Sequence, residues 1–247
     1  MYIERKFTMI RLELVNERTF RKVVDMKLPA EQNCFVAPNV VSLAQAWLYY
    51  EGARPYAVCD DDEVVGFLML DWDENERTVG IWRFMIALEY QKKGYGKKAM
   101  EAAIEMVRAE DKFDLIHLDY VPGNTVARNL YYSLGFRENG EVEDDEIIMT
   151  LPLTNEPKVG MLIADEEDMD DFLEIIHSEK EAGVDIPDEL QDEALLQEAV
   201  AKRCVRRFTI MGETIGFAVG DTLLIEKKSQ QYLEEVQEKL KVVKARL

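Results

Sequence analysis

The sequence predicts a mixed α/β protein in which a central, mainly antiparallel sheet carries helices on both faces and a smaller C-terminal α/β domain follows. Three observations support this fold class. Strand-like and helix-like periodicities alternate along residues 8–153, β-rich runs in residues 55–87 form an antiparallel meander, and a new series of elements begins after the aperiodic residues 152–157. We therefore expect two domains, residues 1–154 and residues 158–247.

The first domain is expected to begin with a strand and two helices. Residues 8–15 alternate as a strand does, and Asn16 is a suitable N-cap for a helix through residues 20–26. Residues 40–50 have helical periodicity, with Ser42 near the start. Three strands are then expected at residues 55–59, 64–71 and 78–87.

Helices and strands alternate through the rest of this domain. The apolar side chains of residues 97–109 fall on one helical stripe, which indicates packing against the sheet. Residues 114–121 are expected to form a strand, after which Asn124 can cap a helix that Gly135 ends. A last strand is expected at residues 146–153.

The C-terminal segment repeats part of this order. We expect a strand, two helices, a hairpin and a charged final helix at residues 159–164, 165–179, 187–202, 207–219 and 230–247. Gly216-Phe217 follows Gly66-Phe67 by 150 residues, and Leu162 follows Leu12 by the same interval. We interpret the segment as a degenerate copy of the first half of the first domain; chance similarity of two hairpins is the alternative.

The composition favours a soluble protein that binds neither nucleic acid nor membrane. Thirty basic residues against 49 acidic ones leave a formal net charge of −19, which attracts cationic substrates or merely keeps the surface soluble. Three scattered cysteines indicate neither a disulfide framework nor a metal site. No segment resembles a signal peptide or a membrane span, so we expect a cytoplasmic protein.

Two motifs carry the chemistry. Gln91-Lys92-Lys93-Gly94-Tyr95-Gly96 lies between a predicted strand and a predicted helix, where backbone N–H groups converge at a positive helix end and glycine permits close approach of a phosphate. By itself this loop is weak evidence and favours a plain strand-to-helix turn. The second motif, NTVARNLYYSLGF at residues 124–136, follows one helix and one strand later.

Together these motifs resemble the signatures of the GNAT superfamily of acetyl-CoA-dependent N-acetyltransferases, Gln/Arg-x-x-Gly-x-Gly/Ala and Asn-x-x-Ala-x-x-Leu-Tyr-x-x-x-Gly-Phe. The resemblance covers residues 8–153 and implies the GNAT fold, with the C-terminal domain as a degenerate half of it. It also implies an acyltransferase that uses acetyl-CoA as cosubstrate and no metal. The glycine-bearing motif does not recur after residue 155, so we expect one active site per chain.

The resemblance also assigns site residues. The expected cofactor-binding residues are Phe84, Met85, Ile86, Gln91, Lys92, Lys93, Gly94, Tyr95, Gly96, Lys97, Asn124, Ala127 and Tyr131. Two of them are expected to be catalytic: a backbone N–H at Ile86 polarises the thioester carbonyl, and Tyr131 protonates the departing thiolate. Asn124 could instead only cap its helix, and Tyr131 could be an ordinary core residue.

The reaction needs a neutral amine, so a base must remove the proton of an ammonium group. We expect a carboxylate, acting directly or through water. The candidates are Glu13, Asp71, Asp73, Glu89, Asp119 and Glu146. A Cys59 nucleophile is not expected, because neither His117 nor His177 stands in a recognisable relation to it.

The acceptor is expected to be a small cationic amine. Residues 35–46, 82–86 and 90–100 are similar to the bacterial diamine and spermidine acetyltransferase branch of the GNAT superfamily, although Ile86-Ala87 replaces the Ile-Asp pair often present there. An aminoglycoside or a peptide amine is the alternative substrate. The non-catalytic alternative is an acetyl-CoA-binding module whose C-terminal domain serves interactions, and a homodimer is left open.

Overall fold

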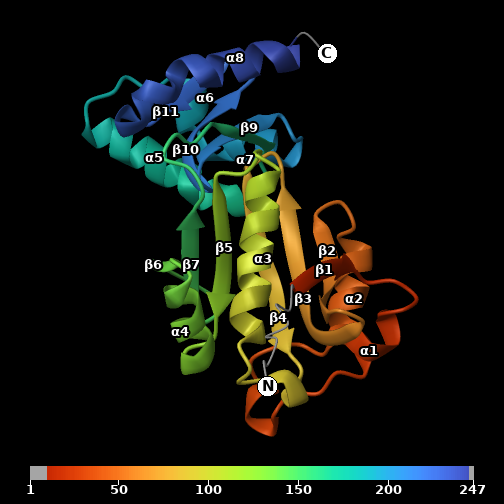
Figure 1. Cartoon of the computed structure of the whole chain (residues 1–247). Helices are drawn as coiled ribbons and strands as arrows, with labels where there is room; N and C mark the ends of the chain where they lie inside the picture. The colour runs from red at the N-terminus through yellow and green to blue at the C-terminus, as the bar shows by residue number, and fades with distance from the viewer. Residues whose placement is uncertain (1–9, 245–247) are drawn as a thin grey trace, which may run out of the picture. The chain divides into compact units, whose positions relative to one another are not determined.

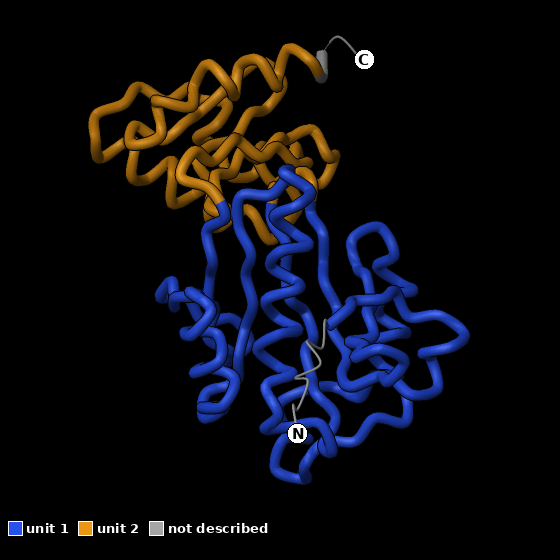
Figure 2. The backbone as a smooth tube through the Cα atoms, viewed as in Figure 1, with its two compact units in different colours: residues 1–73, 78–153 blue, residues 74–77, 154–247 orange. Residues whose placement is uncertain are grey.

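The computed structural model describes residues 10–244, which divide into two compact units (Figures 1 and 2). Unit 1 comprises Met1–Asp73 and Thr78–Leu153, and unit 2 comprises Glu74–Arg77 and Thr154–Leu247. The short turn at residues 74–77 therefore groups with the C-terminal part of the chain. No helix in the described range is both long and apolar enough to cross a membrane.

Unit 1 is built on a seven-stranded sheet with the order β1-β2-β3-β4-β5-β7-β6. Every neighbouring pair is antiparallel except β4 and β5. The strands are β1 (Ile10–Leu14), β2 (Ala53–Asp60), β3 (Glu63–Asp73), β4 (Thr78–Ile86), β5 (Leu115–Tyr120), β6 (Arg137–Glu143) and β7 (Glu146–Pro152). The prediction of a mixed, mainly antiparallel sheet is thus confirmed.

Helices cover both faces of this sheet. Alternate residues of β3 point to opposite faces, so Phe67 packs with the first helices while Leu68 packs with the later ones. The first layer consists of α1 (Phe20–Val24) and α2 (Asn39–Leu48), and the second of α3 (Tyr95–Ala109) and α4 (Thr125–Ser133). Figure 1 shows α3 lying lengthwise along the sheet. Burial on both faces makes β3 the centre of the core.

The parallel contact between β4 and β5 is short. Only Thr78, Val79 and Gly80 pair with β5. A β-bulge then interrupts β4, because Met69 pairs with Arg83 whereas Leu70 pairs with Ile81, which leaves Trp82 as the extra residue. Beyond the bulge, β4 continues along β3 and β5 continues along β7, so one end of the sheet is open between two neighbouring strands.

Some predicted boundaries in unit 1 were wrong. Asn16 does not cap α1, since its side chain accepts from the N–H of Arg18 in the preceding turn and the helix begins at Phe20. The second helix begins at Asn39, which leaves Ser42 buried inside it. The third begins at Tyr95, two residues early. Residues 8–9 of the first predicted strand lie outside the described residues.

Unit 2 contains a four-stranded antiparallel sheet with the order β11-β10-β9-β8. Its strands are β8 (Gly160–Ile163), β9 (Val205–Ile210), β10 (Glu213–Val219) and β11 (Thr222–Ile225), and its helices are α5 (Met169–Glu181), α6 (Asp188–Gln191), α7 (Glu193–Ala201) and α8 (Leu233–Lys244). Residues 187–202 were predicted as one helix, but Asp192 adopts ψ 103° and caps a new helix at residue 193. Residues 245–247 of the final predicted helix lie outside the described residues.

The pairing pattern of unit 2 repeats that of unit 1. Gly66 pairs with Val58 next to a bulge, and Gly216 pairs with Phe208 next to a bulge, at the same 150-residue interval. The first strand is offset: Leu12 pairs with Val58, whereas Met161 rather than Leu162 pairs with Phe208. This register supports the interpretation of unit 2 as a partial copy, which stays a prediction.

Gly66 provides a test of the core. A Cβ at this position would lie 2.6 Å from the backbone oxygen of Met85 and 2.7 Å from Cδ1 of Ile86. We expect Gly66→Ala to lower the free energy of unfolding by about 1–3 kcal/mol, because the added methyl group must displace β4. The variant should also have a lower turnover number. Urea unfolding monitored by circular dichroism measures the stability, and an assay of the expected acetyl transfer measures the turnover.

Gly216→Ala is the matched control. A Cβ there would lie 2.4 Å from the backbone oxygen of Leu224, in the same relation to β11. It should destabilise unit 2 by a similar amount but leave turnover at low temperature unchanged. If Gly66→Ala preserved both stability and turnover, the described contact of Gly66 with β4 would be wrong.

Candidate active site

The open end of the unit 1 sheet contains a cavity of about 670 Å³. Its walls come from β4, the start of α3, the end of β5, α4, the first residue of β7 and the segment before α2. Of the predicted site residues, the structure brings together Phe84, Met85, Ile86, Gln91, Lys92, Gly96, Asn124, Ala127 and Tyr131. Four others, Lys93, Gly94, Tyr95 and Lys97, belong to the same loop and helix start but are not among the lining residues.

The backbone of β4 presents hydrogen-bonding groups to this cavity. The N–H of Ala87 donates to the backbone oxygen of Val65. In an antiparallel pair, alternate residues point their N–H groups toward the same partner, so those of Phe84 and Ile86 point away from β3. They are directed toward the side where β5 has separated. The divergence of β4 and β5 therefore leaves backbone donors facing a space of ligand size.

The start of α3 forms a second wall. Gly94 precedes the helix with φ 84°, a conformation that glycine adopts without strain, and no side chain within the described residues caps this end. The first N–H groups of a helix lack intrahelical acceptors and carry its positive dipole end. A Cβ at Gly96 would lie 3.6 Å from the Leu130 side chain, so the backbone there packs closely on α4. This terminus suits an anionic group such as a pyrophosphate.

Gln91 connects the loop to the rest of the cavity wall. Its Nε2 donates to the backbone oxygen of Ile86 at 2.9 Å and to Oε1 of Gln32 at 2.8 Å. Lys93 and Tyr95 instead hydrogen-bond to residues outside the cavity lining. The Lys93 ammonium donates to the backbone oxygen of Glu89, and the Tyr95 hydroxyl donates to the Asp60 carboxylate. Gln91 thus positions the end of β4, while Lys93 and Tyr95 hold the loop.

Helix α4 contributes Asn124, Ala127 and Tyr131. The prediction of an Asn124 cap is confirmed, because its Oδ1 accepts from the N–H of Ala127 at 3.2 Å. Tyr131 is 7% exposed and lines the cavity, whereas the ring of its neighbour Tyr132 lies against the guanidinium of Arg128 outside it. Burial, with smaller contributions from the charges of Asp119 and Glu146, raises the pKa of Tyr131. Its hydroxyl therefore keeps its proton at neutral pH.

Two of the six candidate carboxylates, Asp119 and Glu146, line the cavity. Burial raises the pKa of both groups, and the charge of Asp119 further raises the pKa of Glu146. Arg83 lies on the same wall, and burial lowers the pKa of its guanidinium against the opposing effect of these two charges. The cavity therefore combines a buried tyrosine, an arginine and two carboxylates, one of which is suited to accept a proton.

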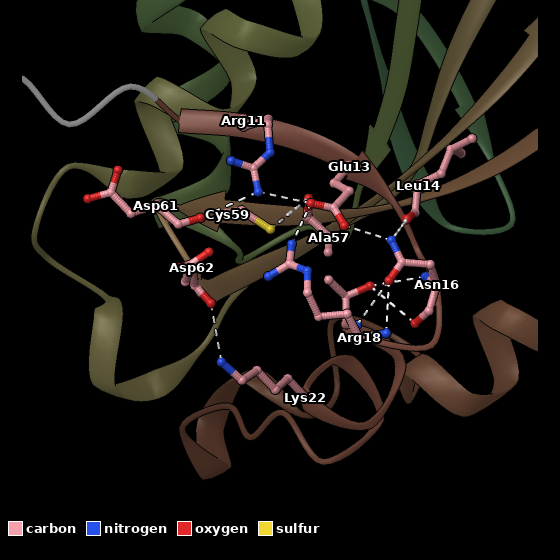
Figure 3. Close-up of polar contacts among 11 residues, drawn as sticks. Arg11, Glu13, Leu14, Asn16, Arg18, Lys22, Ala57, Cys59, Asp61 and Asp62 are labelled. Atoms are coloured by element: carbon pink, nitrogen blue, oxygen red, sulfur yellow. Dashed lines mark hydrogen bonds and ion pairs between the residues drawn. The ribbon is translucent and has the colours of Figure 1, made fainter.

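The remaining carboxylate candidates lie elsewhere. Figure 3 shows Glu13 between Arg11, Asn16 and Arg18, whose hydrogen bonds lower the pKa of its carboxyl to about 2. A carboxylate held in this way is a poor base. The adjacent Cys59 is fully buried, and burial raises the pKa of its thiol, so the thiolate form that a nucleophile requires is disfavoured.

His117 and Asp71 lie together, outside the lining residues of the cavity. Burial lowers the pKa of His117, and the negative charges of Asp119 and Asp71 partly oppose this. The imidazole packs against Gly80, where a Cβ would lie 3.1 Å from both Cε1 and Nε2. This close packing indicates a structural role for His117.

Sequence reasoning missed one wall and one charge. Leu28 and residues 32–38, which precede α2, line the cavity, although the resemblance of residues 35–46 to the diamine and spermidine branch assigned no site residue among them. Arg83 was overlooked because a single arginine in an apolar strand gives no signal by itself. The bulge at Trp82 shifts the register of β4 and places Arg83 in the cavity wall, where its Nη2 lies 3.5 Å from Oε1 of Gln45.

Comparison with known proteins identifies the domain. The sequence model of the acetyltransferase (GNAT) family matches residues 22–136, which contain both motifs and most of the cavity wall. The chain carries a GNAT acetyltransferase domain. The enzyme is therefore an acyltransferase, as the sequence predicted.

Two curated relatives are polyamine enzymes. The spermine/spermidine N(1)-acetyltransferase of Bacillus subtilis (strain 168) is 29% identical over 142 residues, which cover 54% of this chain and 91% of the relative. The probable spermine N(1)-acetyltransferase of Bacillus subtilis subsp. natto (strain BEST195) matches to the same extent.

A solved structure shares the fold. The spermidine N-acetyltransferase from Vibrio cholerae in complex with CoA and spermine has a TM-score of 0.50 and 17% sequence identity, covering 59% of this chain and 96% of the other. This likeness shows that unit 1 has the GNAT fold.

The raised carboxylate pKa values predict the pH dependence. A base acts when deprotonated, so kcat/KM should rise with pH through an apparent pKa above 4.5, the ordinary value for Glu146. Glu146→Gln should remove this acidic limb and lower kcat/KM by about 10²–10⁴-fold. Asp119→Asn should move the limb to lower pH, because it removes a charge that raises the pKa of Glu146.

Glu13→Gln is the control for these profiles, since Glu13 lies outside the cavity. Its profile should match that of the unaltered protein. An acidic limb that persists unchanged in Glu146→Gln would remove Glu146 from the role of base.

Proposed function

We propose that the enzyme transfers the acetyl group of acetyl-CoA to a primary amine of a polyamine such as spermine or spermidine. The observation that carries this proposal is the convergence of four features on one cavity: the β4 backbone donors, the positive end of α3, Tyr131 and the two carboxylates. The two Bacillus subtilis relatives support a polyamine as the acceptor.

The residues fit the donor. The uncapped N–H groups at the start of α3 suit the pyrophosphate, and the N–H groups of Phe84 and Ile86 suit the amide-bearing pantetheine arm, which would run beside β4 as an added strand. Asn124 and Ala127 lie on the facing wall. When bound, acetyl-CoA supplies the thioester that is attacked; its binding residues, and the absence of a metal from the reaction, stay predictions.

The chemistry then requires four proton or charge movements. Glu146 accepts the proton of the substrate ammonium, which leaves a lone pair on nitrogen to attack the acetyl carbon. The N–H of Ile86 donates to the carbonyl oxygen as negative charge develops there. Tyr131 donates its proton to the sulfur as the carbon–sulfur bond breaks, and its raised pKa keeps that proton available beforehand. The nitrogen, which still carries one proton more than the amide product, releases that proton through water and so restores the Tyr131 hydroxyl.

The carboxylates also favour a cationic acceptor. Asp119 and Glu146 place two acidic groups in the cavity wall beside Arg83, whereas the second basic group of the lining, Lys92, belongs to the loop before α3. A chain with formal net charge −19 further attracts a polycation over long range at low salt. The polyamine branch often has an aspartate at the position of Ala87. Asp119 and Glu146 would supply the negative charge that is missing there.

A substrate panel tests the proposal. We expect CoA release with spermine and spermidine, with kcat/KM at least about 10-fold above that for an aminoglycoside or an N-terminal peptide amine, since each 1.4 kcal/mol of differential binding gives a factor of ten. The measurement is thiol release at fixed acetyl-CoA. Binding of acetyl-CoA without acetylation of any amine in the panel would favour the non-catalytic alternative.

Tyr131→Phe tests the acid. The hydroxyl is expected to act only as sulfur departs, so turnover should fall by about 10–10⁴-fold while the KM for acetyl-CoA stays nearly constant. Tyr132→Phe, which alters the neighbouring ring outside the cavity, is the matched control. Unchanged turnover in Tyr131→Phe would exclude Tyr131 from the mechanism.

A further inference from the structure

Helix α2 presents its apolar stripe to solvent. The residues Asn39, Ser42 and Ala46 are buried against the sheet, although two of them are polar. The exposed side chains share the spacing i, i+1, i+4, i+7, i+8 of a single helical face, and they are Val40, Val41, Ala44, Trp47 and Leu48. A surface helix normally has the opposite arrangement.

The patch continues beyond the helix. Trp47 is 77% exposed, and Tyr49 and Tyr50 after the helix are 59% and 68% exposed. With Val40, Val41 and Leu48 these side chains expose roughly 600–700 Å², taking about 150–250 Å² for each whole aromatic side chain. That area exceeds the usual largest apolar patch of a monomer and approaches the roughly 800 Å² per partner of a standard interface. We call these six residues the α2 patch.

Charge indicates what covers the α2 patch. Residues 32–50 contain no Asp, Glu, Lys or Arg, although 32% of the chain is charged and about six such residues would be expected in a stretch of this length. Two copies with a net charge of −19 each repel one another over most of their surfaces. The α2 patch is where that repulsion is weakest and where apolar burial is largest.

We propose that the α2 patch is the interface of a homodimer, in which α2 of one chain packs on α2 of a second copy. An apolar stripe without charges is self-complementary across a two-fold axis, because each residue can meet the same set on the partner. The exposed Trp47 and the two tyrosines provide the aromatic anchors typical of such interfaces.

The inner side of α2 connects this interface to the cavity. Oε1 of Gln45 lies 3.5 Å from Nη2 of Arg83, and the ring of Tyr49 meets that of Trp82 at 5.5 Å, edge to face. The segment before α2, residues 32–38, lines the cavity directly. Docking on the outer face therefore holds the wall that carries Arg83, and this consequence rests on the proposed function.

The test is the mass of the full chain by size-exclusion chromatography with light scattering. The unaltered protein should show twice the chain mass of 28.6 kDa at micromolar concentration. Trp47→Glu should raise the dimer dissociation constant by about 30-fold or more, as loss of an aromatic hot spot of 2 kcal/mol does. Tyr50→Glu, beyond the end of α2, is the second variant if Trp47→Glu fails to fold.

Leu195→Glu is the matched control, because Leu195 is an apolar residue on another helix and is 53% exposed. This variant should stay dimeric. Three results would each overturn the proposal. The unaltered protein could be a monomer at about 100 µM, or it could be a dimer that both patch variants leave intact. It could also be a monomer that sediments with neutral phosphatidylcholine vesicles and depends on Trp47 to do so.

Kinetics provide an independent reading. Monomeric Trp47→Glu should raise the KM for the amine, because α2 contacts Trp82 and Arg83 and the segment before it lines the cavity. The failures of the two proposals are distinguishable. A monomeric mass of the unaltered protein would contradict only the dimer, whereas absence of thiol release by the unaltered protein would contradict only the proposed acetyl transfer.

Discussion

The structure of the site depends on the separation of β4 from β5 after three residue pairs. Elsewhere in the sheet, neighbouring strands satisfy one another's backbone groups. Before the bulge at Trp82, β4 pairs with both β3 and β5, but beyond it β4 pairs with β3 only. The N–H groups of Phe84 and Ile86 are therefore directed into the opening. The cavity, the α3 terminus and Tyr131 all lie around that gap.

Burial then determines how the side chains in the gap behave. Desolvation raises the pKa of Tyr131, Asp119 and Glu146, so the tyrosine holds its proton and the two carboxyl groups bind a proton more readily than they would in water. Glu13 shows the contrast. Two arginines and an asparagine stabilise its charged form, which makes it a structural anchor for the turn before α1.

Sequence patterns predicted the features that depend on neighbouring residues. The β2–β4 meander follows from residue alternation, and Asn124 caps α4 because its side chain can reach the Ala127 N–H. Strand β6 was missed because all seven of its residues are exposed and no apolar alternation marks them. The cavity roles of Arg83 and residues 32–38 depend on the bulge and on packing between distant segments, which periodicity does not reveal. The spacing of the two motifs predicted the GNAT family correctly, because it reflects the placement of α3 and α4 beside the gap.

The proposed acetyl transfer requires the gap between β4 and β5 to bind the acetyl donor. The most direct measurement is a crystal structure of the full chain with CoA and spermine. We expect the pantetheine arm beside Phe84–Ile86, the pyrophosphate at the start of α3 and the thiol next to the Tyr131 hydroxyl. CoA bound in unit 2, or in unit 1 without contact to β4, would contradict it.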